Sequence, residues 1–213
     1  MDTRYQRILW IVIALNFSMF LFEMWGGYAA DSRALEADAL DFLGDSLTYG
    51  VSLWAIGKSL VLRGRIAVIK GVSLTGMGLY VFGKTVYEVF FLGLPQAELM
   101  GAIGVLALFV NVLSVLLLLR YKNGDANVRS VWLCSRNDAI GNVIVIVAAG
   151  AVWGTASGWP DVIVAAIMAG LFLSSAWLIL MQARAEIVED GVSDGATDMI
   201  HKHTDQRHHD RVQ

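Results

Sequence analysis

The chain has 213 residues, of which 56% are hydrophobic and 16% are charged, whereas charged residues make up about 25% of a typical soluble domain. This composition excludes a water-soluble globular fold and predicts an integral membrane protein. The formal net charge of −3 is small, and nothing resembles a nucleic-acid-binding surface, so nucleic acid is excluded as a partner. The only cysteine, Cys134, cannot form an intramolecular disulfide.

Six apolar segments follow one another along the chain, and each is close to the length of about 20 residues that a membrane-spanning helix needs. The first contains Glu23 and lacks a small-residue cleavage site, so we expect a retained transmembrane helix rather than a signal peptide. The segment 58–70, KSLVLRGRIAVIK, is predicted to be a basic loop, and Pro160 suits the first turn of the last helix. The expected fold is an all-α membrane protein with six transmembrane helices, at 8–28, 34–57, 67–92, 98–119, 130–155 and 160–182.

The positive charges predict how these helices are oriented. All of the 16 lysines and arginines except Arg33, Lys84 and Arg136 fall in segments that a six-helix arrangement places on one side of the membrane. Both termini should therefore be cytoplasmic, in a multi-pass protein of the inner membrane. Residues 1–182 form the expected transmembrane domain, and 183–213 form a short charged tail that contains all four histidines. The tail either captures metal or is simply solvated.

Three aspartates, Asp38, Asp41 and Asp45, interrupt the second apolar segment. Spacings of three, four and seven residues place them on one face of a helix. A charged side chain at the centre of a bilayer costs at least ~2.5 kcal/mol, so we expect a protein-lined polar site that holds a cation or protons. The alternative is that these carboxyl groups only make polar contacts between helices.

The fifth segment repeats this pattern, because Cys134, Asp138 and Asn142 share one helix face. Since the second helix runs inward and the fifth outward, Asp45 and Asp138 can lie at similar depth. With a third carboxylate and the thiol they would form a four-ligand oxygen and sulfur site suited to Zn²⁺. Cys134 is equally well explained as a small core residue.

Other polar residues interrupt the apolar segments. Asn16 and Glu23 are seven residues apart on one face of the first helix, and with Asn142 and Asn111 they either line a path or bridge helices. Lys84 and Glu88, four residues apart in the third segment, are predicted to form an ion pair with each other.

With these residues identified, the chain resembles the cation diffusion facilitator family of divalent metal transporters. The second helix of that family reads approximately Ala-Asp-Ala-x-x-His/Asp-x-x-x-Asp, and the chain has Ala37, Asp38, Ala39, Asp41 and Asp45 at these places. The resemblance covers the whole six-helix unit and implies transport of a divalent metal ion.

The same resemblance implies the metal ligands Asp41, Asp45, Cys134 and Asp138, with Cys134 standing where His or Asp is usual. A thiolate favours Cd²⁺, Zn²⁺ or Co²⁺. Asp38 is expected to cap or orient rather than coordinate. Most family members carry a cytoplasmic domain after the sixth helix. This chain is expected to be a short form without it, and to form a homodimer through its membrane helices.

The sequence thus predicts a transporter that exports Zn²⁺, Cd²⁺ or Co²⁺ and takes up protons. Carboxyl groups in a low dielectric hold protons when no cation is present, and an arriving metal ion displaces them. No prosthetic group is expected. An enzyme is not expected either, because the membrane region has no histidine and no nucleophile–base pair. The alternatives are a channel, or a non-transporting metal sensor or assembly subunit.

Overall fold

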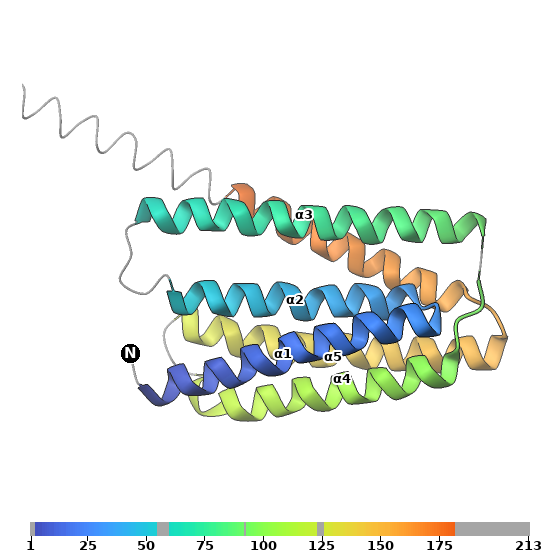
Figure 1. The fold of residues 1–213 in the computed structure, drawn as a ribbon, viewed down its shortest axis with the longest axis horizontal. Coiled ribbons are helices and arrows are strands. Elements are labelled where there is room, and N and C mark those ends of the chain that lie inside the picture. The colour runs from blue at the N-terminus through green and yellow to red at the C-terminus, as the bar shows by residue number, and fades with distance from the viewer. Residues whose placement is uncertain (1–2, 55–59, 92, 123–125, 182–213) are drawn as a thin grey trace, which may run out of the picture.

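The computed structural model describes residues 3–54, 60–91, 93–122 and 126–181, so the expectations for the tail at 183–213 lie outside the described residues. Within these ranges the chain is helical and contains no strand, which confirms the all-α prediction. The long axes of the helices run roughly along the molecule (Figure 1). The elements are α1 (Thr3–Ala30), α2 (Arg33–Trp54), α3 (Leu60–Phe90), α4 (Ala97–Leu118), the short 3₁₀ turn η1 (Leu119–Tyr121), α5 (Ala126–Thr155) and a last helix, Trp159–Met181.

The predicted basic loop at 58–70 is wrong, because α3 begins at Leu60 and contains most of that segment. The segment is rich in Leu, Val, Ile and Arg and contains no proline. Its one glycine, Gly64, costs about 1 kcal/mol in a helix, which a 31-residue helix tolerates. Clustered positive charge indicates the side of the membrane, and it does not by itself end a helix.

Four helices in the described part of the chain are long and apolar enough to cross a membrane: Thr3–Ala30, Ala97–Tyr121, Val131–Thr155 and Trp159–Met181. α2 is not among them because it carries Arg33, Glu36 and three aspartates. These aspartates, Asp38, Asp41 and Asp45, are called the stripe of α2 below. The position of α2 depends on packing against the others.

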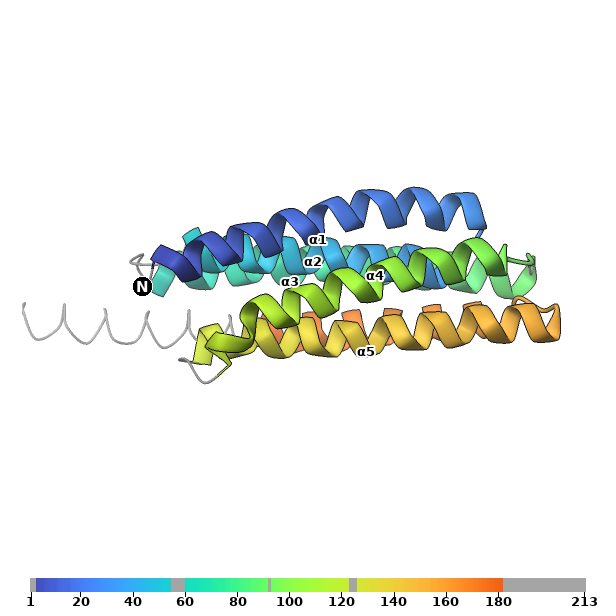
Figure 2. The same cartoon turned by 90° about the horizontal axis from the view of Figure 1, so that it is seen from below.

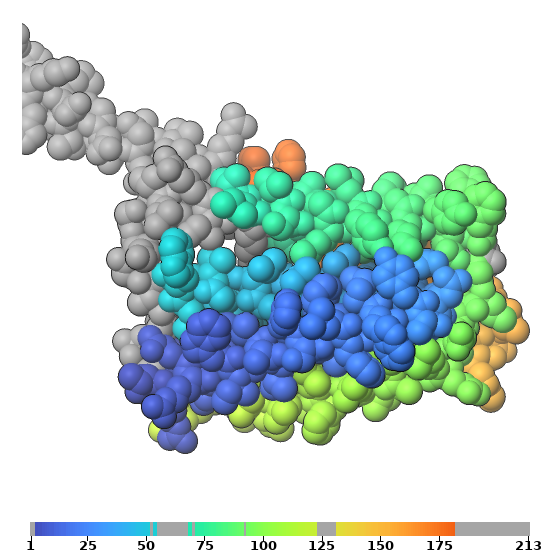
Figure 3. Space-filling view, viewed as in Figure 1, coloured from blue at the N-terminus to red at the C-terminus, as the bar shows by residue number. Residues whose placement is uncertain are grey.

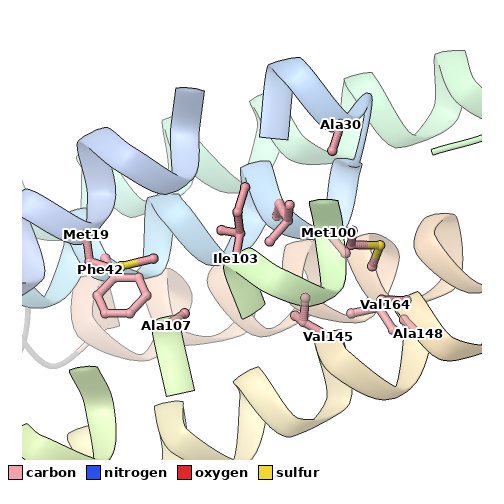
Figure 4. Packing of buried hydrophobic residues seen from close by; sticks show 12 residues of the cluster. Met19, Ala30, Phe42, Met100, Ile103, Ala107, Val145, Ala148 and Val164 are labelled. Atoms are coloured by element: carbon pink, nitrogen blue, oxygen red, sulfur yellow. The ribbon is translucent and has the colours of Figure 1, made fainter. Parts of the chain in front are cut away.

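α1 packs against α2 and α4, and α4 packs against α5. Figure 2 shows α1 and α4 inclined to α2 and α3, which overlap in that view. One apolar cluster joins α1, α2, α4, α5 and the last helix, and Figure 4 shows Phe42 of α2 within it, near Met19 of α1 and Ala107 of α4. A second cluster joins α2 to α3 and the last helix through Leu40, Leu74 and Phe172.

The outer surface is apolar. α1 and α3 form much of the face in Figure 3, and their exposed side chains include Trp10, Trp25, Phe82 and Phe90. Large apolar side chains on this scale would be costly in water. They suit contact with lipid.

The end of the molecule opposite the N-terminus is called the far end, and it holds the turn between α1 and α2 (Figure 1). Here Arg33 pairs with three carboxylates: Asp31 at 2.5 Å, Glu88 of α3 at 3.1 Å, and Glu36. Lys84 of α3 lies 3.5 Å from Glu36. The predicted pairing of Lys84 with Glu88 is therefore wrong, because each of them pairs with α2 instead. These contacts fasten α3 to the start of α2.

Replacing Arg33, which pairs with all three carboxylates, should destabilise the fold. Arg33→Ala leaves Glu88 and Glu36, whose side chains are 7% and 2% exposed, without their guanidinium partner. Loss of one partner of a buried ion pair costs about 3 kcal/mol or more. Thermal unfolding of the purified protein in detergent measures the loss. Arg7→Ala, at an exposed position of α1, serves as the control and should change stability by less than about 0.5 kcal/mol. Equal unfolding temperatures for the two variants contradict the role given to Arg33.

Candidate metal centre

The aspartates of α2 line a pocket together with side chains of α4 and α5. This pocket, called the acid pocket below, has an empty volume of about 150 Å³ and no room for a water-sized sphere. α2 reaches it with one face because its residues 38, 41, 42 and 45 repeat at helical spacing. The structure therefore brings together three aspartates of α2 with the predicted partner on α5. The lining residues are Asp38, Asp41, Phe42, Asp45, Asn111 and Asp138.

The four carboxyl groups have little to neutralise them. Asp138 is close enough to Asp41 and Asp45 for their charges to interact, and its Oδ2 has no hydrogen-bond partner among the described residues. No lysine or arginine is among the described residues that line the pocket. Ionised carboxylates this close repel one another strongly in a low dielectric. Bound protons or a cation would relieve that repulsion.

The carboxyl groups of the acid pocket are not arranged to coordinate an ion in this structure. In the part of the chain that the structure describes, no three His, Cys, Asp or Glu side chains approach closely enough to hold a metal ion as they stand. Asp41 and Asp45 are only half-buried, whereas Asp38 is buried. A metal ion would therefore need the carboxyl groups to turn toward it.

Asp38 is held by an amide chain that links three helices. Asn142 of α5 donates from Nδ2 to Asp38 Oδ2 at 2.5 Å, and Asn111 of α4 donates from Nδ2 to Asn142 Oδ1 at 2.8 Å. All three side chains are buried. This arrangement orients Asp38 toward Asn142 rather than toward the other carboxyl groups of the pocket. From the sequence, Asn111 is expected only to line a path or bridge helices, and its position among apolar residues is the only signal.

Asn16 and Glu23 lie on the buried face of α1, with exposed fractions of 1% and 0%. Neither side-chain polar atom of Asn16 has a hydrogen-bond partner among the described residues, whereas the Glu23 carboxyl group lies within hydrogen-bonding reach of Asp38. Glu23 is close enough to Asp38 and Asp41 for their charges to interact. Neither residue lines the acid pocket, so they lie behind it, on the α1 side of α2.

Cys134 lies beside the acid pocket rather than in its lining. The half-buried side chain packs against the apolar cluster that contains Tyr5, Leu9 and Tyr49, and it is near enough to Asp138 to influence it electrostatically. Both interpretations of the thiol, as ligand and as core residue, are compatible with this place.

Tyr49 is a residue that the sequence analysis missed. Its hydroxyl donates to Asp45 Oδ2, one helical turn away, and lies 3.5 Å from Ser135 Oγ of α5. The signal was present in the sequence, since a tyrosine four residues after an aspartate shares its helix face. Tyr49 orients Asp45 much as Asn142 orients Asp38.

Known proteins resemble this chain over most of its length. The metal cation efflux system protein CzcD of Cupriavidus metallidurans is 27% identical over 89% of this chain and 63% of its own length. Zinc transporter ZitB of Escherichia coli is 28% identical over 88% of this chain and 64% of its length. A cadmium, cobalt and zinc/H⁺-K⁺ antiporter of Bacillus velezensis is 26% identical over 92% of this chain and 67% of its length. The chain thus spans about two thirds of these relatives.

The sequence profile of the cation efflux transmembrane domain matches residues 66–188, which is more than half of the chain. That match includes α4, α5 and the last helix, and the relatives extend the similarity to most of the remaining residues. The chain belongs to the cation efflux family, the cation diffusion facilitators.

Proposed function

We propose that this protein exports a divalent transition-metal cation of the zinc, cadmium and cobalt class in exchange for protons. The observation that carries the proposal is the acid pocket, where four carboxyl groups share about 150 Å³ and the described lining residues include no lysine or arginine. Several buried carboxylates are costly unless protons or a cation neutralise them. A positively charged substrate fits this requirement.

The proposed ligands are Asp41, Asp45 and Asp138, with Cys134 as the fourth. Three carboxylate oxygens and a thiolate suit Zn²⁺ or Cd²⁺ better than Mg²⁺, which prefers oxygen alone. Binding requires deprotonated ligands, so the metal ion and the protons occupy the pocket in turn. Alternating exposure of the pocket to the two sides of the membrane then couples the two movements.

The proposed topology has six membrane crossings with cytoplasmic termini in the inner membrane. α2 is too polar to qualify by composition, but its charges point into the bundle rather than toward lipid, and both α2 and α3 pack against apolar helices. The N-terminus, the start of α3 and the end of α4 lie at one end of the molecule, where most lysines and arginines of the described chain occur (Figure 1). A homodimer would form through membrane helices.

The names of the relatives support the class of substrate. They describe efflux of metal cations, zinc transport, and exchange of cadmium, cobalt and zinc for H⁺ and K⁺. The chain matches about 63% of the length of CzcD, so the activity of the whole relative is not transferred to it. The proposal for this chain concerns the membrane pathway alone.

The first test is metal flux in proteoliposomes made with the purified protein. Wild-type protein should transport Cd²⁺ or Zn²⁺ faster when a proton gradient drives protons in the direction opposite to the metal ion. Asp45→Ala and Asp138→Ala each remove a central ligand and should lower the flux at least ~10-fold while the protein stays folded. Glu98→Ala, which removes an exposed carboxyl group outside the acid pocket, is the matched control and should leave the flux unchanged.

Three results would contradict the proposal. Normal flux in either aspartate variant removes the acid pocket from the pathway. Absence of metal-dependent flux in the wild type favours a sensor or assembly subunit, and flux that ignores the proton gradient favours a channel.

A second test asks whether the thiol of Cys134 is a ligand. A thiolate binds soft ions better than hard ones, so Cys134→Ser should weaken Cd²⁺ binding about 10-fold more than Mn²⁺ binding. Cys134→His should restore a more ordinary Zn²⁺ site. Isothermal titration of the purified variants with Cd²⁺, Zn²⁺ and Mn²⁺ measures these affinities. If serine leaves the Cd²⁺ to Mn²⁺ affinity ratio unchanged, Cys134 is a core residue and the aspartates bind the ion without it.

A further inference from the structure

The first turn of α2 is capped by a carboxylate from the last helix. Asp161 accepts a hydrogen bond from Ser32 Oγ at 2.6 Å, from the backbone N–H of Arg33 at 2.7 Å and from that of Ala34 at 3.1 Å. The partners lie more than 120 residues apart in the sequence. Asp161 is 1% exposed, so the contact is fully within the protein.

The other polar groups at the start of α2 are also paired. Ser32 Oγ also accepts from the Leu35 N–H at 3.1 Å, and the Ser32 carbonyl accepts the first helical bond, from the Glu36 N–H. The N–H groups of the first turn, which a helix cannot satisfy itself, are thus all paired. A carboxylate at this place also interacts favourably with the positive end of the helix dipole. Asp161 therefore ties the start of α2 to the last helix.

α2 transmits that position to the acid pocket. No glycine or proline lies between Ala34 and Asp41, and the helix continues without a break through Gly44 to Asp45. At a rise of about 1.5 Å per residue, Asp38 is roughly 6 Å from the capped end and Asp45 roughly 16 Å. A slip of one residue would turn the stripe by about 100°, away from Asp138. The bond from Asn142 to Asp38 is the second fixed point and sets α2 against α5.

The side chain of Arg33 does not compete for Asp161. Its guanidinium is directed to Asp31, Glu36 and Glu88, while its backbone N–H meets Asp161. The two interactions therefore have different roles. The ion pairs fasten α3 to α2, and the carboxylate cap orients α2 relative to the last helix.

We propose that Asp161 is a positioning residue of the metal site, which sets the rotation and depth of α2 so that Asp41 and Asp45 face Asp138. The inference rests on the proposed function, because it assigns a role in binding the transported ion to a residue outside the acid pocket. Asp161 does not contact the ion and acts through the helix that it caps.

The test compares variants of the full chain in proteoliposomes and measures the KM and the maximum rate of Cd²⁺ transport, together with the unfolding temperature. Asp161→Asn keeps the shape of the side chain but replaces one acceptor oxygen by a donor. It should raise the KM for Cd²⁺ about 10-fold, as loss of a group that orients a ligand does, with a smaller effect on the maximum rate. Ser32→Ala removes one of the three bonds and should raise the KM by less. Ser32→Thr retains the hydroxyl group, so its KM for Cd²⁺ should equal that of the wild type.

Val152→Ala is the matched control for stability. Val152 is a buried residue of α5 that lies outside the acid pocket and does not bond to α2, so its truncation should lower the unfolding temperature and leave the KM unchanged. If Asp161→Asn and Ser32→Ala behave in the same way as Val152→Ala, Asp161 has only a structural role and the inference is wrong. If Asp161→Asn does not reach the membrane, the KM values of Ser32→Ala and Ser32→Thr test the inference. A KM raised by alanine but not by threonine supports it, and an unchanged KM in Ser32→Ala overturns it. Absence of flux in the wild type instead overturns the proposed function.

Discussion

Repulsion among the carboxyl groups of Asp38, Asp41, Asp45 and Asp138 is the constraint on which the rest of the structure depends. Four acids in one small pocket, inside a bundle with an apolar surface, are stable only if protons or cations neutralise them. A soluble protein could leave such groups in water. Here Asp38 is buried and the other three carboxyl groups are half-buried between helices, so a positive charge in the pocket would stabilise them.

The contacts around the pocket oppose this repulsion. Asn142 holds Asp38 and Tyr49 holds Asp45, each through a hydrogen bond to one carboxyl oxygen. At the far end, Asp161 caps α2 and the ion pairs of Arg33 fasten α3 to it. α2 is thus anchored at its start by Asp161 and held further along by Asn142 and Tyr49. The carboxyl groups of Asp41 and Asp138 keep room to turn toward an ion. Rigid backbone and adjustable ligands are what a site needs if it is to bind and then release its substrate.

Features that depend on neighbours within one helix could be predicted from the sequence. The stripe of α2 follows from helical spacing alone, and its pairing with Asp138 follows from the antiparallel order of the segments. Features that depend on distant residues could not be predicted. Lys84 and Glu88 have suitable spacing for each other, yet α2 offers both of them partners, and nothing local relates Asp161 to the start of α2. The start of α3 was missed because charge was taken as the sign of a loop.

Under the proposed function, protons and a metal ion compete for the same carboxyl groups of the acid pocket. Isothermal titration of the purified protein with Cd²⁺, in two buffers that differ in their heat of protonation, counts the protons released for each ion bound. The account predicts one ion per chain and the release of about one to two protons near pH 7, both lost when Asp45 and Asp138 are replaced together by Asn. Binding without proton release, or proton release that persists in the double variant, would contradict it.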